Sequence, residues 1–142
     1  MNIRIKKINP MAIMPEYAHE GDAGMDVFSL AEKKIAPGEI ALVGIGLALE
    51  IPQGYEIQVR PRSGLALKHG ITVLNSPGTI DSGYRGEIGV ILINHGREMF
   101  FVEKGMKIAQ LVVTKYEKAS LIEVENLCES QRSIDGFGST GM

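Results

Sequence analysis

The sequence predicts an all-β protein, and three observations support this. Runs in which apolar and polar residues alternate, such as residues 3–6 and 56–60, are typical of strands with one solvent-facing side. The 17 glycines and six prolines interrupt the chain too often for long helices. Turn-forming residues separate the apolar runs at close intervals, as in a sandwich or barrel. A chain of 142 residues is expected to form one such domain.

The expected strands follow one another along the chain. Residues 88–93 form an almost unbroken apolar run rich in β-branched side chains, as in a strand buried on both faces. Asn94-His95-Gly96 lies between two strand-like runs and predicts a tight hairpin. Residues 63–69 alone have a helical character, with Ser63 placed to cap a single turn. The remaining expected strands are residues 71–74, 100–102, 108–113 and 121–124.

The last part of the chain differs from the rest. Its apolar pattern is lost, so we expect a β domain over residues 1–128 and a flexible arm over residues 129–142. A lone Phe137 stands between glycines in this arm, where a closing flap would use it as an anchor. The glycine spacing here matches the dinucleotide fingerprint only formally, because that motif should follow a strand and open a helix.

Charge and cysteine content exclude several classes of function. Lysine and arginine total 15 against 17 aspartates and glutamates, so a net charge of −2 excludes nucleic-acid binding by bulk positive charge. One cysteine, Cys128, excludes an internal disulfide and a cysteine-rich zinc site. The three histidines share no metal-ligand spacing. The charged first eight residues hold no signal core, and no apolar stretch is long enough for a membrane span, so we expect a soluble cytoplasmic protein.

Two segments offer donors for an anion. Arg62 precedes the expected helical turn, where the backbone amides of Ser63 and Gly64 would face a ligand. An ordinary capped turn is the simpler interpretation of that segment. The arm offers further donors: Arg132, Ser139 and Thr140.

Three polar residues in or near strands are candidates for chemistry. Asp81 lies in the densely polar stretch 75–86 and is either a proton acceptor for a water or a turn-forming residue. Gln110 is the sole polar residue in an apolar run, so it either faces solvent or points its amide into a pocket. Asp26 follows a glycine-rich segment and either pairs with an arginine, approaches the water shell of a metal, or is a surface charge.

The order of these segments resembles the five motifs of the trimeric dUTPases, the deoxyuridine triphosphate nucleotidohydrolases. The segments are Ala23-Gly24-Met25-Asp26, residues 61–66, residues 75–86, Gly105-x-Lys107-Ile108-Ala109-Gln110-Leu111, and Gly136-Phe137-Gly138-Ser139-Thr140-Gly141. The resemblance covers essentially the whole chain. It implies a jelly-roll-like β-barrel that forms a homotrimer with an active site at each subunit interface. It also implies hydrolysis of dUTP to dUMP and pyrophosphate, which removes dUTP from the nucleotide pool and supplies dUMP for thymidylate synthesis.

The resemblance implies roles for the residues that would bind the nucleoside. Asp81 would orient and activate the attacking water and bind the deoxyribose 3′-OH. Tyr84 would pack under the sugar and exclude a ribose 2′-OH. Asn75 and the backbone near Gly89 would read the uracil edge. Two more residues would line the same site: Thr79 and Ile80.

The resemblance implies a second group of residues around the phosphates. Arg62, Ser63 and Gly64 would hold the phosphates, and Gln110 would contact the α-phosphate or the water. Mg²⁺ would be held mainly by the triphosphate, with no direct protein ligand, and Asp26 would lie near that phosphate–magnesium shell. Lys107 stands where the family often has arginine. The closing arm would comprise Arg132, Phe137, Gly138, Ser139 and Thr140, with Phe137 over the base and the others on the γ-phosphate.

Two alternatives remain from the sequence. One is a nucleotide enzyme related to the dCTP deaminases, which share the barrel. The other is a trimeric β-barrel binding module without catalysis. Asp81 separates the latter from an enzyme, because a carboxylate beside a phosphate site repels the ligand unless chemistry requires it. Nucleic-acid and membrane partners are not expected.

Overall fold

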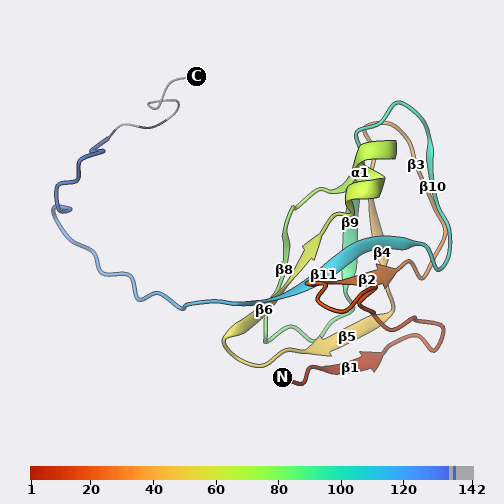
Figure 1. The fold of residues 1–142 in the computed structure, drawn as a ribbon, viewed down its shortest axis with the longest axis horizontal. Coiled ribbons are helices and arrows are strands. Elements are labelled where there is room, and N and C mark those ends of the chain that lie inside the picture. The colour runs from red at the N-terminus through yellow and green to blue at the C-terminus, as the bar shows by residue number, and fades with distance from the viewer. Residues whose placement is uncertain (135, 137–142) are drawn as a thin grey trace.

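The computed structural model describes residues 1–134 and 136, and within them the chain is mostly β-structure with one short helix, α1 (Ser63–His69) (Figure 1). The strands are β1 (Arg4–Lys7), β2 (Gly24–Phe28), β3 (Lys33–Ile35), β4 (Ile40–Gly44), β5 (Leu47–Glu50), β6 (Tyr55–Arg60), β7 (Ile71–Val73), β8 (Gly78–Ile80), β9 (Gly89–Asn94), β10 (Phe100–Val102) and β11 (Lys107–Lys115).

These strands form four antiparallel sheets. The largest has the order β2-β11-β6-β8, and a three-stranded sheet has the order β4-β9-β7. Two pairs, β1–β5 and β10–β3, complete the set. The predicted all-β fold class is therefore confirmed, although the described strands are grouped in separate sheets and form no single closed barrel.

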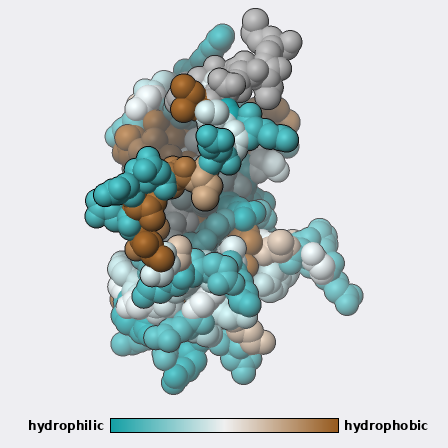
Figure 2. Space-filling view, turned by 90° about the vertical axis from the view of Figure 1, so that its left-hand side faces the viewer, coloured by the Kyte–Doolittle hydropathy of each residue, from teal (hydrophilic) through white to brown (hydrophobic). Residues whose placement is uncertain are grey.

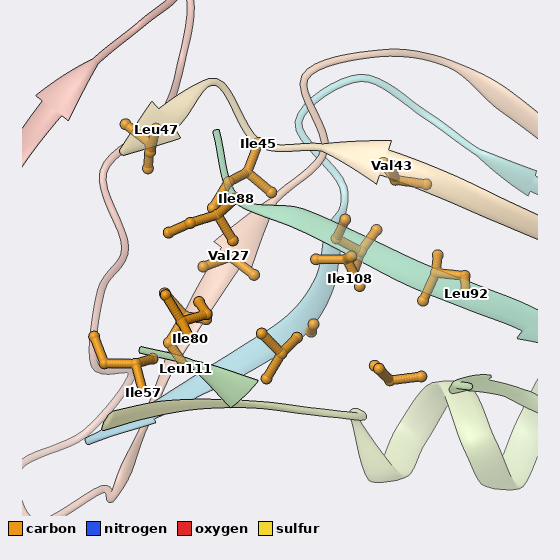
Figure 3. Packing of buried hydrophobic residues seen from close by; sticks show 14 of the residues in the cluster. Val27, Val43, Ile45, Leu47, Ile57, Ile80, Ile88, Leu92, Ile108 and Leu111 are labelled. Carbon is orange, nitrogen blue, oxygen red and sulfur yellow. The ribbon is translucent and has the colours of Figure 1, made fainter. Parts of the chain in front are cut away.

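The core lies between the sheets (Figure 3), and apolar residues of the alternating runs either belong to it or, like Ile3 and Ile5, are partly buried against it. In β6, Ile57 and Val59 are buried while the polar residues between them are not, because successive side chains of a strand point to opposite faces. β9 departs from the prediction of burial on both faces, since Ile91 on its outer face is only half-buried. The labelled core residues are Val27, Val43, Ile45, Leu47, Ile57, Ile80, Ile88, Leu92, Ile108 and Leu111.

The predicted hairpin at residues 94–96 is wrong. β9 pairs with β4 and β7, whereas β10 pairs with β3. The side chain of Asn94 explains this: its amide donates to the carbonyls of Ile35 and Glu98 at 2.8 Å each. Its Oδ1 also accepts the N–H of Gly96 at 2.8 Å. The fully buried Asn94 thus holds a corner that turns the chain away from β9.

The helix begins differently from the prediction. Arg62, with an extended backbone, is the N-cap of α1, and no side chain makes a capping bond there. Ser63 is the first helical residue, so its predicted capping role is wrong. The helix has seven residues, which is about two turns rather than one. It ends at Gly70, whose positive φ of 67° suits glycine.

The predicted strand at residues 121–124 is absent. After β11, residues 116–134 contain no strand or helix and run away from the body of the molecule (Figure 1). We call residues 116–134 the extended segment. Its apolar side chains are uncovered, with Leu121 94% and Leu127 88% exposed. Figure 2 views the molecule from the side on which this segment lies and shows hydrophobic residues exposed among hydrophilic ones.

No helix among the described residues has the length and apolar character required to span a membrane.

Candidate active site

Most residues of the predicted nucleoside group surround one small hollow. It lies where β8 ends and β9 begins, and its volume is about 210 Å³. Its lining consists of Thr79, Ile80, Asp81, Tyr84, Glu87, Ile88 and Gly89. We call it the Asp81 hollow. Asn75 is not part of the lining but lies close by against β8, where a Cβ on Gly78 would come within 3.1 Å of its amide nitrogen.

Local structure holds Asp81 and Tyr84 at this hollow. Ile80 is buried and anchors the end of β8 in the core, so the next residue, Asp81, is exposed. The N–H of Tyr84 donates to the carbonyl of Asp81 at 3.1 Å and closes a turn. The phenol of Tyr84 donates to the carbonyl of Glu87 at 2.9 Å. A Cβ on Gly86 would collide with that phenol, so glycine there lets the ring lie close to the loop.

A second group gathers around Asp26 on β2. Asp26 is only 3% exposed, so the interpretation as a surface charge is wrong. Its Oδ2 lies 3.0 Å from Nζ of Lys107, and its Oδ1 lies 3.3 Å from Nε of Arg62. Nε2 of Gln110 donates to the same Oδ1 at 3.2 Å. We call Asp26, Arg62, Lys107 and Gln110 the Asp26 cluster.

The cluster keeps Asp26 ionised. Burial alone would raise the pKa of this carboxyl group, but hydrogen bonds from Lys107 and Gln110 and the charges of Arg62 and Lys107 outweigh burial and lower the pKa below its ordinary value. Asp26 in turn raises the pKa of Lys107, which also pairs with Glu16 at 3.3 Å. The cluster therefore carries one negative and two positive charges at neutral pH, and Glu16 beside Lys107 adds a second negative charge at its edge.

Sheet register assembles this cluster from distant parts of the sequence. Asp26 on β2 lies opposite Gln110 on β11, and Gln110 lies opposite Arg60 on β6. Arg62 lies two residues after the end of β6, and its guanidinium also donates to the carbonyl of Lys107 at 3.3 Å. Gly24 leaves space for Gln110, because a Cβ there would come within 3.1 Å of the amide oxygen. Ser63 and Gly64 are exposed at the start of α1, next to Arg62 in the sequence.

Gln110 also borders a shallow hollow that Gly24 and Arg60 line with it. Its side chain is half-buried, which lies between the two positions that the sequence left open.

The Asp81 hollow and the Asp26 cluster lie at different ends of the same sheet. Ile80 pairs with Ile57 on β6, whereas the Asp26 row crosses β6 at Arg60. From Asp81 to that row is about four residues, or roughly 13 Å along the strands, and β8 to β2 is about three strand spacings, or roughly 14 Å. The two groups are therefore on the order of 20 Å apart across the sheet.

A dUTPase family model matches residues 11–141. The chain belongs to the dUTPase family. A deoxyuridine 5′-triphosphate nucleotidohydrolase of Alkaliphilus metalliredigens is 62% identical over 141 residues, covering 99% of this chain and 98% of the relative. The dUTPase of Staphylococcus bacteriophage 80alpha, solved with dUpNHpp, superposes with a TM-score of 0.93 at 30% identity and 99% coverage of both chains.

A third similar protein reports a metal ion. It is a mutant dUTPase of phage phi11 of S. aureus, described with a structural Mg(II) ion. It has a TM-score of 0.83 at 26% identity and covers 89% of this chain and 98% of its own. In this dUTPase-family chain, the described residues include no group of three histidine, cysteine, aspartate or glutamate side chains placed to hold a metal.

The predicted arm residues of this dUTPase-family chain lie apart from both groups or outside the described residues, and two residues of the groups were not predicted as site residues. Arg132 is exposed on the extended segment. Glu87 lines the Asp81 hollow without having been predicted; its signal was its position directly after the polar stretch 75–86. Lys107 was noted only as a replacement for arginine, and its pairing with Asp26 depends on register. The predictions on Phe137, Gly138, Ser139 and Thr140 lie outside the described residues.

Proposed function

We propose that this chain hydrolyses dUTP to dUMP and pyrophosphate, with deoxyuridine in the Asp81 hollow of one copy and the phosphates at the Asp26 cluster of another. The observation that carries the proposal is the pairing of an exposed carboxylate, Asp81, with the ring of Tyr84 around one small hollow. Because the chain belongs to the dUTPase family, we assign to this pairing the roles of a base and a sugar contact at the same place.

Asp81 is the proposed catalytic base. It takes a proton from a water while the water oxygen forms a bond to the α-phosphorus. The bond from that phosphorus to the bridging oxygen breaks, and pyrophosphate leaves. A positioned base typically contributes about 10²–10⁴-fold to such a step. Holding the water in line with the leaving oxygen contributes further.

The hollow suits a nucleoside and not a whole triphosphate. Its volume of about 210 Å³ lies below the roughly 300–1,000 Å³ usual for pockets that enclose a ligand. Tyr84 packs under the deoxyribose and leaves no room for a 2′-OH. Asn75 and the backbone near Gly89 read the uracil edge. Thr79 and Ile80 complete the walls.

The Asp26 cluster suits the phosphate end. The guanidinium of Arg62 is a planar donor held in position by Asp26, and Ser63 and Gly64 follow it with exposed backbone. Gln110 contacts the α-phosphate or the attacking water. Mg²⁺, held by the triphosphate, would neutralise part of the phosphate charge. Since Asp26 is already paired with two cations, it fits the ion's water shell better than direct coordination.

We further propose a homotrimer in which copies share sites. The separation of the hollow from the cluster supports this, because one nucleotide would then be held between two chains. The uncovered apolar side chains of the extended segment support it as well. Leu121, Ile122 and Leu127 are 81–94% exposed in a single copy, and packing against a neighbouring copy would remove them from water. Residues 129–142, including Arg132 and Phe137, form the arm that closes a site.

Pyrophosphate release, measured in parallel with dUTP, dTTP, dCTP and UTP, tests this function. We expect kcat/KM for dUTP to exceed the others by at least about 100-fold, because the hollow has walls that a 5-methyl group, a 4-amino group or a 2′-OH would meet. Ammonia release from dCTP would instead identify a deaminase. Binding of dUTP without any turnover would identify a binding module. We place the enzyme in the cytosol, where the single exposed thiol of Cys128 stays reduced.

A further inference from the structure

We propose that Glu87 is a positioning residue that fixes Tyr84 at the Asp81 hollow and so sets the preference for deoxyribose over ribose. This inference rests on the proposed function. Glu87 lies in the loop between β8 and β9 and lines the hollow with Asp81 and Tyr84.

The side chain of Glu87 ties this loop to a distant part of the fold. The N–H of Gly46, in the bend between β4 and β5, donates to its Oε1 at 2.9 Å. Glycines make this contact possible. A Cβ on Gly44 would lie 2.6 Å from the same oxygen, and Gly46 has a positive φ of 72°. The carboxylate therefore occupies a space that the two glycines of the bend, Gly44 and Gly46, leave open, and we call this space the seat of Glu87.

The main chain of Glu87 holds the phenol of Tyr84. Its carbonyl accepts the Tyr84 hydroxyl at 2.9 Å. The N–H of the following residue, Ile88, donates to the carbonyl of Leu47 at 2.9 Å, so this peptide is bonded at both of its polar atoms. The bond from Gly46 extends the anchorage from Ile88 toward the loop that carries Tyr84. One residue thus links the ring to the β4–β5 bend.

This linkage matters because Tyr84 has little other support. Tyr84 is 48% exposed and lies on a loop outside the core. Exclusion of a 2′-OH is a steric effect, so it is only as sharp as the position of the ring. A shift of about 1 Å in a contacting group can change rates substantially. Loosening Glu87 should therefore admit UTP more than it harms the reaction of dUTP.

Two matched substitutions separate positioning from charge. Glu87→Gln keeps the length and an acceptor oxygen but removes the charge. Glu87→Asp keeps the charge but shortens the side chain, so it no longer reaches Gly46. We expect Glu87→Asp to reduce the dUTP-to-UTP ratio of kcat/KM by roughly tenfold, the effect of about one hydrogen bond. The change should come mainly from a lower KM for UTP, while kcat for dUTP changes less than about threefold. Glu87→Gln should retain the ratio within about twofold.

A double-mutant cycle tests the link to the phenol. Tyr84→Phe removes only the hydroxyl and should reduce the ratio similarly. Combining it with Glu87→Asp should add little, because both changes break the same connection. Gly44→Ala provides an independent variant that leaves Glu87 in place but fills its seat, and it should also reduce the ratio. Thermal unfolding of each variant establishes that the compared proteins are folded.

Three results would overturn the proposal. One is an unchanged ratio in folded Glu87→Asp and Gly44→Ala. Another is a loss in Glu87→Gln with an unchanged ratio in Glu87→Asp, which would show that the charge matters and not the bond to Gly46. Additive losses in the cycle are the third. A wild-type protein that does not hydrolyse dUTP would instead refute the proposed function itself, whereas normal wild-type turnover with an unaffected ratio refutes only the role of Glu87.

Discussion

Two aspartates in this protein have opposite surroundings and hence suit opposite tasks. Asp26 is enclosed and paired with Lys107 and Arg62, so its charge is already compensated. Asp81 is exposed beside the hollow, and its carboxylate accepts no hydrogen bond from the described residues. A carboxylate that is to take a proton from water must have an accessible lone pair. Of the two, Asp81 meets that requirement.

Substituting Asp81 tests its role as the base. Asp81→Asn preserves shape but cannot accept the proton, so kcat should fall by at least about 100-fold while affinity for dUpNHpp changes only several-fold. Steady-state pyrophosphate release and titration calorimetry measure the two quantities. Glu103→Gln, an exposed acidic residue far from the hollow in sequence, is the control. Near-normal turnover in Asp81→Asn would remove Asp81 from the chemical step.

The lowered pKa of Asp26 predicts a pH dependence of stability. A carboxyl group whose pKa falls on folding stabilises the native state above the unfolded value of 3.8, and this stabilisation is lost as pH falls through the folded pKa. The difference in free energy of unfolding between wild type and Asp26→Asn should therefore be constant from about pH 5 to 7 and shrink below about pH 4. Denaturant titrations across this range provide the measurement. A difference that stays constant down to pH 3 would show that the ion pairs are not the cause.

At the scale of elements, the sequence predicted little more than half of the described strands and one strand, at residues 121–124, that the structure lacks. Alternation in residues 56–60 predicted β6 because its apolar face packs in the same chain. The apolar residues at 121–124 predicted a strand that is absent, since an apolar pattern indicates a face suited to burial but does not show that the chain itself covers it. The turn at Asn94 was misjudged because a side chain, and not strand pairing, satisfies the carbonyls there.

The candidate site was predictable to the same extent. Motif order indicated Asp81 and Tyr84, which the structure places at one hollow because they are neighbours in sequence. The contact of Asp26 with Lys107 depends on how β2 and β11 align. The bond from Gly46 to Glu87 likewise joins segments 41 positions apart. No local spacing encodes either contact.

Removing the proposed closing arm is a test at the level of elements. Deleting residues 129–142 should lower kcat/KM for dUTP by at least about tenfold, because closure over the base and phosphates excludes water. The unfolding temperature and the number of copies in the oligomer should be retained, since the core lies within residues 12–111. Phe137→Ala in the full chain is the matched variant, with a loss near that of one base stack, about 1–3 kcal/mol. A fully active truncated protein would contradict the closing role.

For the whole molecule, the separation of the Asp81 hollow from the Asp26 cluster makes it possible to test whether a site is shared between copies. If the site is shared, two inactive variants must complement each other. Asp81→Asn damages only the hollow and Arg62→Ala only the cluster. Co-refolded in equal amounts, they should recover roughly a quarter of wild-type activity, because each site draws an intact half from either chain with even odds.

The same mixing experiment has a clear contrary outcome. If every copy built its own complete site, each chain in the mixture would still carry one damaged half, and activity would stay at the level of the separate variants. Light scattering of the mixture reports the assembly state in parallel. A fully active monomer would also contradict shared sites.

The extended segment has a consequence for the life of a newly made chain. In a single copy, the extended segment has no helix or strand and exposes apolar side chains. Proteases preferentially cut such accessible segments. In the proposed assembly, companions shelter that stretch. Unassembled copies would then be degraded quickly and assembled copies would persist. Proteolysis in the cell would thereby keep the fraction of unassembled copies low without a dedicated regulator.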